Sequence, residues 1–407
     1  MLPTVPQAAA PPTAAGLAAV AAGAERAGAG GVWACDHLFW HGPVVECLTA
    51  LGVAAAATER CTIGSAVLQL PLRDAGVVAK QAASLQDLSA GRFVLGLGVG
   101  SHPGEYEAAG RDYAARGRRL DAQVADLRSL WSGGLAAHPG GPVPAADAGH
   151  GAAPHDATTG STTTGSGTTG SGTTGGTTTG STTTGSGTTG STDEARYRQR
   201  PVAGDVPVWF GGSSPAALDR AARLGDGWMP LFLAPDEYHA ALGSLSARRE
   251  DAGRDPGTLV ASIVVFVSLA GGAPGAAGRA LDRGAAWMSS LYRLPPRAFA
   301  RHLVAGTARE CAARVARWVE AGADHVVAFV TDDAPLVQFE DLATALADIL
   351  GDGPGAGLAP AGPRRGTVGP STALPSDGAG TWPARPATPV ARTPADRTTL
   401  AATPGPS

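Results

Sequence analysis

The chain has 407 residues, of which 58 are Gly, 32 are Pro and 5% are aromatic, and its formal net charge is −4. That length suffices for one large or two medium domains, but so many glycines and prolines do not fit within one core, so part of the chain is expected to lie outside the fold. The slightly negative charge gives no reason to expect a nucleic-acid partner.

The cysteines and the N-terminus bear on the compartment. The four cysteines form no C-x-x-C pair and no spacing typical of a zinc site or a disulfide framework, which predicts free thiols in a reducing cytoplasm. The first basic residue, Arg26, follows the apolar N-terminal stretch, whereas a signal peptide carries its positive charge before that stretch. No apolar run reaches transmembrane length. We therefore expect a soluble, cytoplasmic protein without a metal site.

Short apolar runs alternate with helical patterns in the first third of the chain. The expected strands are residues 1–7 (the end of a strand whose beginning is missing), 31–35, 61–70 and 93–99, and the expected helices are 13–28, 44–58, 77–88 and 112–131. Residues 93–99 contain no charge, so both faces of this strand should be buried, as in a parallel sheet. The strand runs into Gly98-Val-Gly100, where the backbone can turn or come close to a ligand.

The pattern stops between residues 133 and 195. Residues 158–192 contain only Thr, Gly and Ser. Such a segment cannot bury enough apolar surface to offset the entropy lost on ordering, so we predict a disordered, Thr/Gly-rich surface insertion. Residues 351–407, rich in Pro and Gly and without periodicity, are predicted to be a disordered tail.

Strands and helices return after the insertion. Residues 259–269 (LVASIVVFVSL) form the clearest strand, because they are rich in β-branched side chains. The other expected strands are 206–210, 225–230 and 325–330, and the expected helices are 216–224, 235–252, 276–290, 296–303, 307–321 and 336–350. Eight strands then alternate with helices, which predicts an α/β protein with one closed (β/α)8 TIM barrel within residues 1–350.

Five stretches, in matching order and spacing, resemble the bacterial luciferase-like superfamily. They are VWACDHL at 32–38, IGSAVL at 63–68, SAGRFVLGLGVG at 89–100 with RGRRLD at 116–121, PVWFGG at 207–212 with AARLGDGW at 221–228, and AGADH at 321–325. The resemblance implies a (β/α)8 barrel that binds FMN or the deazaflavin coenzyme F420 at the carboxyl ends of its strands. The family includes two-component monooxygenases that use reduced FMN, and dehydrogenases or reductases that use the deazaflavin.

Asp36 and His37 follow the second predicted strand, where a barrel places its active site. They offer a carboxylate and a titratable imidazole side by side. The resemblance implies that the pair lies near the ring system of the cofactor and that the histidine accepts or places a proton, so both are our catalytic candidates. The alternative is an Asp that caps a loop and a His at the surface.

Three strand ends are expected to hold the cofactor. The resemblance implies a non-prolyl cis peptide near Ala66-Val67, forming a bulge behind the ring; the alternative is an ordinary buried strand. The glycines after the fourth strand allow close backbone approach, or simply a tight turn. Free amides at a helix start attract phosphate, so the loop after the fifth strand is the predicted phosphate site, with a plain loop as the alternative. The predicted cofactor-binding residues are Ser65, Ala66, Val67, Gly98, Gly100, Ser101, Gly211, Gly212 and Ser213.

Trp40, His102 and Trp228 are the predicted substrate-pocket residues, because each lies beyond a strand end. For Trp228 the alternative is a position in the core, and for His102 a solvated loop. Ser101 departs from the sugar-phosphate dehydrogenase branch, in which the resemblance implies a glutamate acid at about this place. The nearest carboxylate is Glu105, four residues on, so we expect neither that substrate nor that acid here.

The leading hypothesis for function is hydride transfer between coenzyme F420 and a small organic substrate. One alternative is a monooxygenase that uses reduced FMN and needs a partner flavin reductase; another is a flavin-binding protein without catalysis. A metal-dependent hydrolase built on Asp36, His37 and His102 would need a clustered His-x-His motif, which the sequence lacks. The family often forms dimers, but no surface stripe argues for a homodimer.

Overall fold

The computed structural model of the protein describes residues 1–5, 12–134, 206–331 and 335–350. Most of the predicted insertion, 133–195, and all of the predicted tail, 351–407, lie outside the described residues. None of the described helices is both long enough and apolar enough to cross a membrane.

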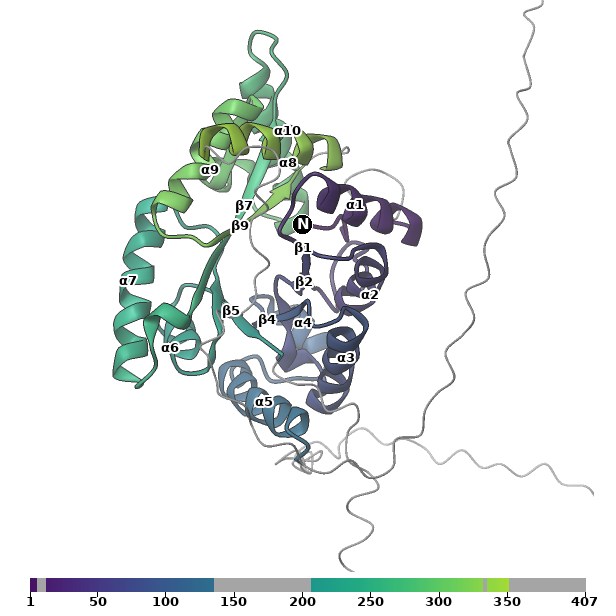
Figure 1. The fold of residues 1–407 in the computed structure, drawn as a ribbon, viewed down its shortest axis with the longest axis vertical. Coiled ribbons are helices and arrows are strands. Elements are labelled where there is room, and N and C mark those ends of the chain that lie inside the picture. Colours follow the sequence, from purple (N-terminus) through teal and green to yellow (C-terminus); the bar gives the residue numbers. More distant parts are fainter. Residues whose placement is uncertain (6–11, 135–205, 332–334, 351–407) are drawn as a thin grey trace, which may run out of the picture. The chain divides into compact units, whose positions relative to one another are not determined.

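Nine strands of the described chain form one sheet, in which every paired neighbour is parallel (Figure 1). The strand order is β1 (Gly31–Ala34), β2 (Thr62–Ser65), β4 (Phe93–Gly98), β5 (Val208–Gly211), β6 (Gly227–Met229), β7 (Val260–Leu269) and β8 (Leu303–Gly306), while β3 (Leu68–Gln69) pairs with β4 and β9 (His325–Val330) pairs with β7. Parallel neighbours need a crossover connection, which is why helices follow most of the strands.

The first residues of the chain close the sheet. The amide of Leu2 donates to the carbonyl oxygen of Trp33 on β1 at 2.7 Å. The terminal amino group of Met1 donates to the carbonyl oxygen of Ala328 on β9 at 2.9 Å. This segment therefore stands between β1 and β9, in the place of the predicted first strand, and the protein has the expected (β/α)8 barrel fold.

Helices surround the strands in Figure 1. They are α1 (Ala14–Arg26), α2 (Cys47–Ala57), α3 (Ala75–Leu88), α4 (Pro103–Ala108), α5 (Arg116–Trp131), α6 (Pro215–Leu224), α7 (Pro235–Asp251), α8 (Ala276–Tyr292), α9 (Ala308–Glu320) and α10 (Pro335–Leu350), with the short 3₁₀ turns η1 (Leu70–Leu72), η2 (Pro256–Thr258), η3 (Pro296–Ala298) and η4 (Ala300–His302). Several start where the sequence supplies a cap; Thr307 and Glu310, for example, form a capping box at the start of α9.

Two predicted elements differ from the structure. The prediction of a helix over residues 296–303 is wrong: η3 and η4 are followed there by β8. Leu303 is buried and pairs with Phe266 of β7, so the chain becomes extended there and the helical turns end at His302. The predicted strand 61–70 is divided into β2, β3 and η1.

Alternate residues of the strands divide the core into two layers. Inside the barrel, the ring centroids of Trp33 and Trp209 lie 5.0 Å apart. Gly64 leaves the room for Trp33, because an added Cβ there would lie 2.4 Å from the tryptophan ring. On the other face, side chains such as Phe210 pack against the helices. Side chains thus fill the barrel, and functional groups gather where the strands end.

Candidate active site

His37, half-buried at the end of β1, is held by a buried carboxylate. Its Nδ1 lies 3.1 Å from Oε2 of Glu105, a residue of α4 that is only 1% exposed. The amides of Leu38 and Phe39 donate to the other carboxylate oxygen at 3.0 and 3.2 Å, and Gln69 Nε2 donates to Oε2 at 3.1 Å. Three of these four partners belong to the loop after β1 and the fourth, Gln69, belongs to β3, so the carboxylate joins the two segments.

These contacts decide the charge of Glu105 and the tautomer of His37. Burial by itself would raise the pKa of Glu105, but the hydrogen bonds from His37, Gln69 and the Phe39 amide outweigh burial and hold this pKa below its usual range. Gln69 Nε2 also lies 3.3 Å from His37 Nδ1, but its two hydrogens are used on the Asp36 carbonyl oxygen and on Glu105 Oε2, both at 3.1 Å. An ionised carboxylate only accepts hydrogen bonds, so Nδ1 of His37 carries the hydrogen. Nε2 is then left with a lone pair that can accept a proton.

Aromatic rings fix the imidazole from the side. Trp40 stacks on His37 with centroids 3.8 Å apart and an interplanar angle of 27°, and His102 meets Trp40 edge-on at 5.3 Å. His41 ties the same loop to α8, because its Nε2 lies 3.0 Å from the carbonyl oxygen of Ser290. The indole Nε1 of Trp40 is buried and has no hydrogen-bond partner among the described residues, so the site contains one unused donor.

Asp36 lies beside this group but is fully engaged. It is 4% exposed; its Oδ1 accepts from Arg73 Nη2 at 2.6 Å, and its Oδ2 accepts from the Gln69 amide at 2.9 Å. Burial raises the pKa of Asp36, and the neighbouring Arg73 opposes that rise. The carboxylate thus joins the end of β1 to β3, and Gln69 connects it to the carboxylate that holds His37.

The Ala66-Val67 peptide bond is cis, as the resemblance implied. Three glycines leave space around this segment: an added Cβ would lie 2.6 Å from Val67 Cγ2 at Gly98, 3.1 Å from Val67 Cγ1 at Gly211, and 2.0 Å from the Ser65 carbonyl oxygen at Gly96. Two of the three predicted cofactor segments therefore meet the third at Val67. The hydroxyl of Ser65 points elsewhere and donates to the Gly96 carbonyl oxygen at 2.8 Å.

The neighbouring turns are built from glycines with positive φ. Gly100 has φ +69, and an added Cβ would lie 2.0 Å from Gln69 Oε1, so this turn packs directly on the His37 network. Ser101 and His102 follow it and are exposed. After β5, Gly212 (φ +93) and Ser213 are exposed in front of α6, where an anion could reach the first amides of the helix.

Trp228 is a core residue. Its side chain is 0% exposed and stacks on Tyr238 of α7 with centroids 5.2 Å apart. Its Nε1 donates to the Gly212 carbonyl oxygen at 2.8 Å. Trp228 therefore lies in the core, which was the alternative to a place in the substrate pocket. We leave it out of the proposed pocket, and its hydrogen bond supports the loop after β5.

The family model for luciferase-like monooxygenase matches residues 2–160 and 173–273, which is more than half of the chain. The chain belongs to the luciferase-like monooxygenase family. Among its curated relatives, a phthiodiolone/phenolphthiodiolone dimycocerosates ketoreductase of Mycobacterium kansasii is 26% identical over 257 residues, 62% of this chain and 57% of the relative. The chain spans little more than half the length of the curated relatives it matches first, 57% in each case.

Solved structures similar to this luciferase-like protein include users of both cofactors. An F420-dependent secondary alcohol dehydrogenase in complex with an F420–acetone adduct has a TM-score of 0.58 at 18% identity and covers 81% of this chain and 94% of its own. The FMN-bound oxygenating constituent of 3,6-diketocamphane monooxygenase, from a plasmid of Pseudomonas putida, has a TM-score of 0.55 at 13% identity and covers 82% and 92%. These likenesses show the shared fold.

The residues of this luciferase-like protein fit a flavin-type cofactor. The glycines around Val67 leave space in which a flat ring could lie against the backbone, and Gly212 and Ser213 expose backbone before a helix. Trp40 Nε1 is a buried donor that has no partner among the described residues. The sequence pointed to the glycines near Val67 and to the loop of Gly212 and Ser213. It did not point to Gln69 or Arg73, for which a polar and a basic residue at the end of an apolar strand were the only signal, and it set Glu105 aside.

Proposed function

We propose that this protein is an oxidoreductase that transfers a hydride between coenzyme F420 and a small secondary alcohol or ketone. The observation that carries the proposal is the Glu105–His37 pair, which leaves His37 Nε2 as a proton acceptor at the mouth of the barrel. The ketoreductase relative and the fold shared with a secondary alcohol dehydrogenase support this substrate class.

The chain would supply the proton chemistry and the cofactor the hydride chemistry. When bound, a deazaflavin accepts a hydride at a ring carbon and reacts poorly with oxygen. In alcohol oxidation, His37 Nε2 takes the hydroxyl proton while the hydride leaves from the substrate carbon. The imidazolium that results lies beside the ionised carboxylate of Glu105, which stabilises it. For ketone reduction the same proton returns from His37 to the oxygen.

The other site residues would hold this arrangement. Trp40 limits rotation of the imidazole by stacking, and Asp36 fixes the end of β1 through Arg73 and Gln69. The cofactor ring would lie on the Ala66-Val67 segment, between the turns that contain Gly98, Gly100 and Ser101 and the loop Gly211, Gly212 and Ser213, which would hold its phosphate. The substrate would lie beside Trp40 and His102.

A monooxygenase that uses reduced FMN from a separate flavin reductase is the second candidate. The FMN-bound monooxygenase shares the fold over most of both chains. In that case His37 and Glu105 would still hold a proton, and the substrate would be oxygenated.

The test is a fluorescence titration of the full chain with oxidised F420 and, separately, with FMN. Binding of F420, followed by bleaching of its absorbance on addition of a secondary alcohol such as propan-2-ol, is the expected result. His37→Asn should keep F420 binding and lose the bleaching, whereas the exposed control Thr49→Ala should keep both. Preference for FMN, with turnover only in the presence of oxygen and a reductase, would move the assignment to the second candidate. Binding of neither cofactor would overturn both.

A further inference from the structure

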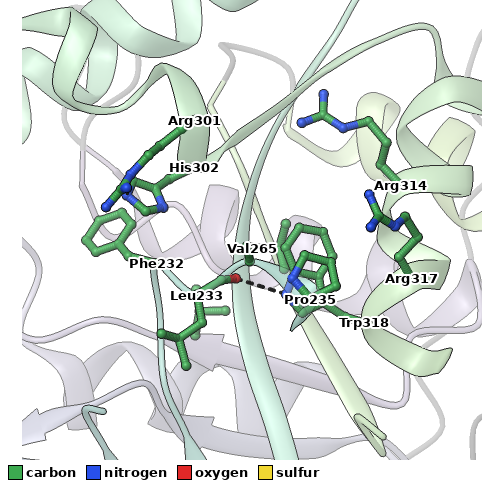
Figure 2. A pocket seen from close by; sticks show the side chains of 11 residues that line it. Phe232, Leu233, Pro235, Val265, Arg301, His302, Arg314, Arg317 and Trp318 are labelled. Atoms are coloured by element: carbon green, nitrogen blue, oxygen red, sulfur yellow. Dashed lines mark hydrogen bonds between the residues drawn. The ribbon is translucent and has the colours of Figure 1, made fainter. Parts of the chain in front are cut away.

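A cavity of about 190 Å³ lies beside β7 (Figure 2). It opens where the loop after β6 leaves β7 and before β8 joins it: Leu231 pairs with Val264, and Leu303 pairs with Phe266, two residues further on. Its walls are residues 232–235 of that loop, the middle of β7, the turn η4 and one face of α9.

The polar side chains of this cavity are all basic or hydrogen-bond donors. Arg301 and His302 of η4 line one side, and Arg314, Arg317 and Trp318 of α9 line the other (Figure 2). No Asp or Glu is among the lining residues. Within the described ranges, no carboxylate lies within 4 Å of these three guanidinium groups as an ion-pair partner. The positive charge that faces the cavity is therefore not balanced there.

Several of these groups are already held in place. Arg314 donates to the carbonyl oxygens of Ala305 and Leu303 at 3.4 and 3.3 Å, which keeps its guanidinium next to β8. The indole of Trp318 donates to the Leu233 carbonyl oxygen at 3.0 Å, as the dashed line in Figure 2 shows, and so fixes the wall between α9 and the loop after β6. Holding the donors in position before binding reduces the entropy that a ligand must offset.

The histidine adds a neutral donor. Arg301 Nε donates to His302 Nε2 at 2.8 Å, so Nε2 accepts and the ring hydrogen is on Nδ1. Burial, and then the charge of Arg301, lowers the pKa of His302, while Glu237 of α7 acts in the opposite sense. The Glu237 carboxylate is itself occupied, since it accepts from the Ala234 amide at 2.9 Å. Guanidinium and imidazole N–H groups only donate here, and a ligand that only accepts would match them.

We propose that this cavity is a binding site for a small organic anion, a carboxylate or a phosphate monoester. Guanidinium groups match both anions through paired N–H donors. The volume of about 190 Å³ is below the ~300–1,000 Å³ of pockets that enclose drug-sized ligands, so a whole nucleotide is too large. Phe232, Leu233 and Val264 give the carbon skeleton of the ligand an apolar wall.

The cavity shares no lining residue with the predicted cofactor cradle, which is residues 65–67, 98–101 and 211–213, and the proposal does not depend on the proposed function. The cradle segments lie at the ends of β2, β4 and β5, whereas the cavity lies between the loop after β6 and α9. Arg301, Arg314 and Arg317 are exposed, but they come from two separate segments, η4 and α9, and line the same cavity, which the arginines of a single solvated helix face would not do.

The test is isothermal titration of the full-length protein with inorganic phosphate and, in a second arm, with succinate, with chloride adjusted to keep the ionic strength constant. The variant is Arg314→Gln/Arg317→Gln, and the matched control is Arg309→Gln, an exposed arginine of the same helix that does not line the cavity. We expect saturable binding by the wild type, weakened about tenfold for each arginine removed, as loss of one charge-assisted hydrogen bond predicts, and unchanged by the control.

Three outcomes would overturn the proposal: no saturable binding of either anion, an equal loss in the Arg309 control, or displacement of the anion by F420. The last would assign the binding to the cofactor cradle. The two arms separate phosphate from carboxylate selectivity, and because neither needs cofactor or turnover, the result is independent of whether the oxidoreductase assignment holds.

Discussion

Glu105 Oε2 lies 3.1 Å from His37 Nδ1, although 68 positions separate the two residues in the chain. The contact exists because α4 begins directly after the Gly100 turn and brings its buried carboxylate under the loop that follows β1. One residue thus sets the tautomer of another, and this relationship gives the first prediction.

Glu105→Gln should lower kcat for the proposed oxidation by roughly 10²–10⁴-fold, the range of a lost general base. The amide can still accept from Leu38 and Phe39, but its NH₂ group would face Nδ1 of His37 and favour the tautomer in which Nε2 carries the hydrogen. Steady-state kinetics and the Kd for F420 are the measurements, and the Kd should change little. Glu107→Gln, an exposed change on the same helix, is the control; an equal loss of kcat in both variants would contradict the role of Glu105.

Gly98→Ala should weaken cofactor binding and cost about 1–3 kcal/mol in the free energy of unfolding, because the new Cβ overpacks the segment. It would lie 2.6 Å from Val67 Cγ2. Gly52→Ala in α2, where nothing lies within 4 Å of the added Cβ, should instead stabilise by about 0.5–1 kcal/mol. Urea unfolding and F420 titration check both variants. Val67→Ala combined with Gly98→Ala should recover part of the stability, and failure to recover any would show that Val67 is not the obstacle.

Trp228→Phe should weaken binding of the phosphate-bearing cofactor while leaving KM for the substrate nearly unchanged. The change removes the donor to the Gly212 carbonyl oxygen, and loss of one hydrogen bond costs about 0.5–1.5 kcal/mol. Trp318→Phe is the matched control, since it removes the donor to Leu233 at 3.0 Å: stability should fall but the Kd for F420 should hold. An altered substrate preference in Trp228→Phe would contradict the core position and show that Trp228 lines the substrate pocket.

Glu25 should contribute stability that depends on pH. Burial opposes the effect, but backbone hydrogen bonds from Cys61, Arg60 and Glu59 lower the pKa of Glu25 from 4.5 to about 2. Because the folded pKa is the lower one, this stability is present above pH ~4.5 and is lost as the pH falls toward 2. Glu25→Gln should therefore destabilise the protein at pH 7 and matter progressively less below pH ~4.5. Urea unfolding at pH 7 and at pH 3 checks this, and a difference from wild type that does not shrink at pH 3 would contradict it.

The sequence by itself determined the class of fold, the family and the order of the elements except β8. Uninterrupted apolar runs such as 93–99 predict strands buried on both faces, and in a parallel sheet the ends of such strands meet at one edge. That reasoning placed Asp36, His37 and the three cofactor segments at the same end of the barrel. The motifs around Val67 and Gly98 were among those that indicated the family, and the resemblance to the family in turn implied the cis peptide bond.

The tertiary structure decided which side chains meet. Strand periodicity shows that neighbouring residues face opposite sides but not which side is the interior, so the position of Trp228 in the core needed the packing of α7. Glu105 was set aside because it stands four residues from the expected place; only the turn at Gly100 brings it to His37. Likewise β8 forms because β7 offers a free edge beyond β6. Contacts between distant segments depend on backbone geometry, and local sequence does not encode it.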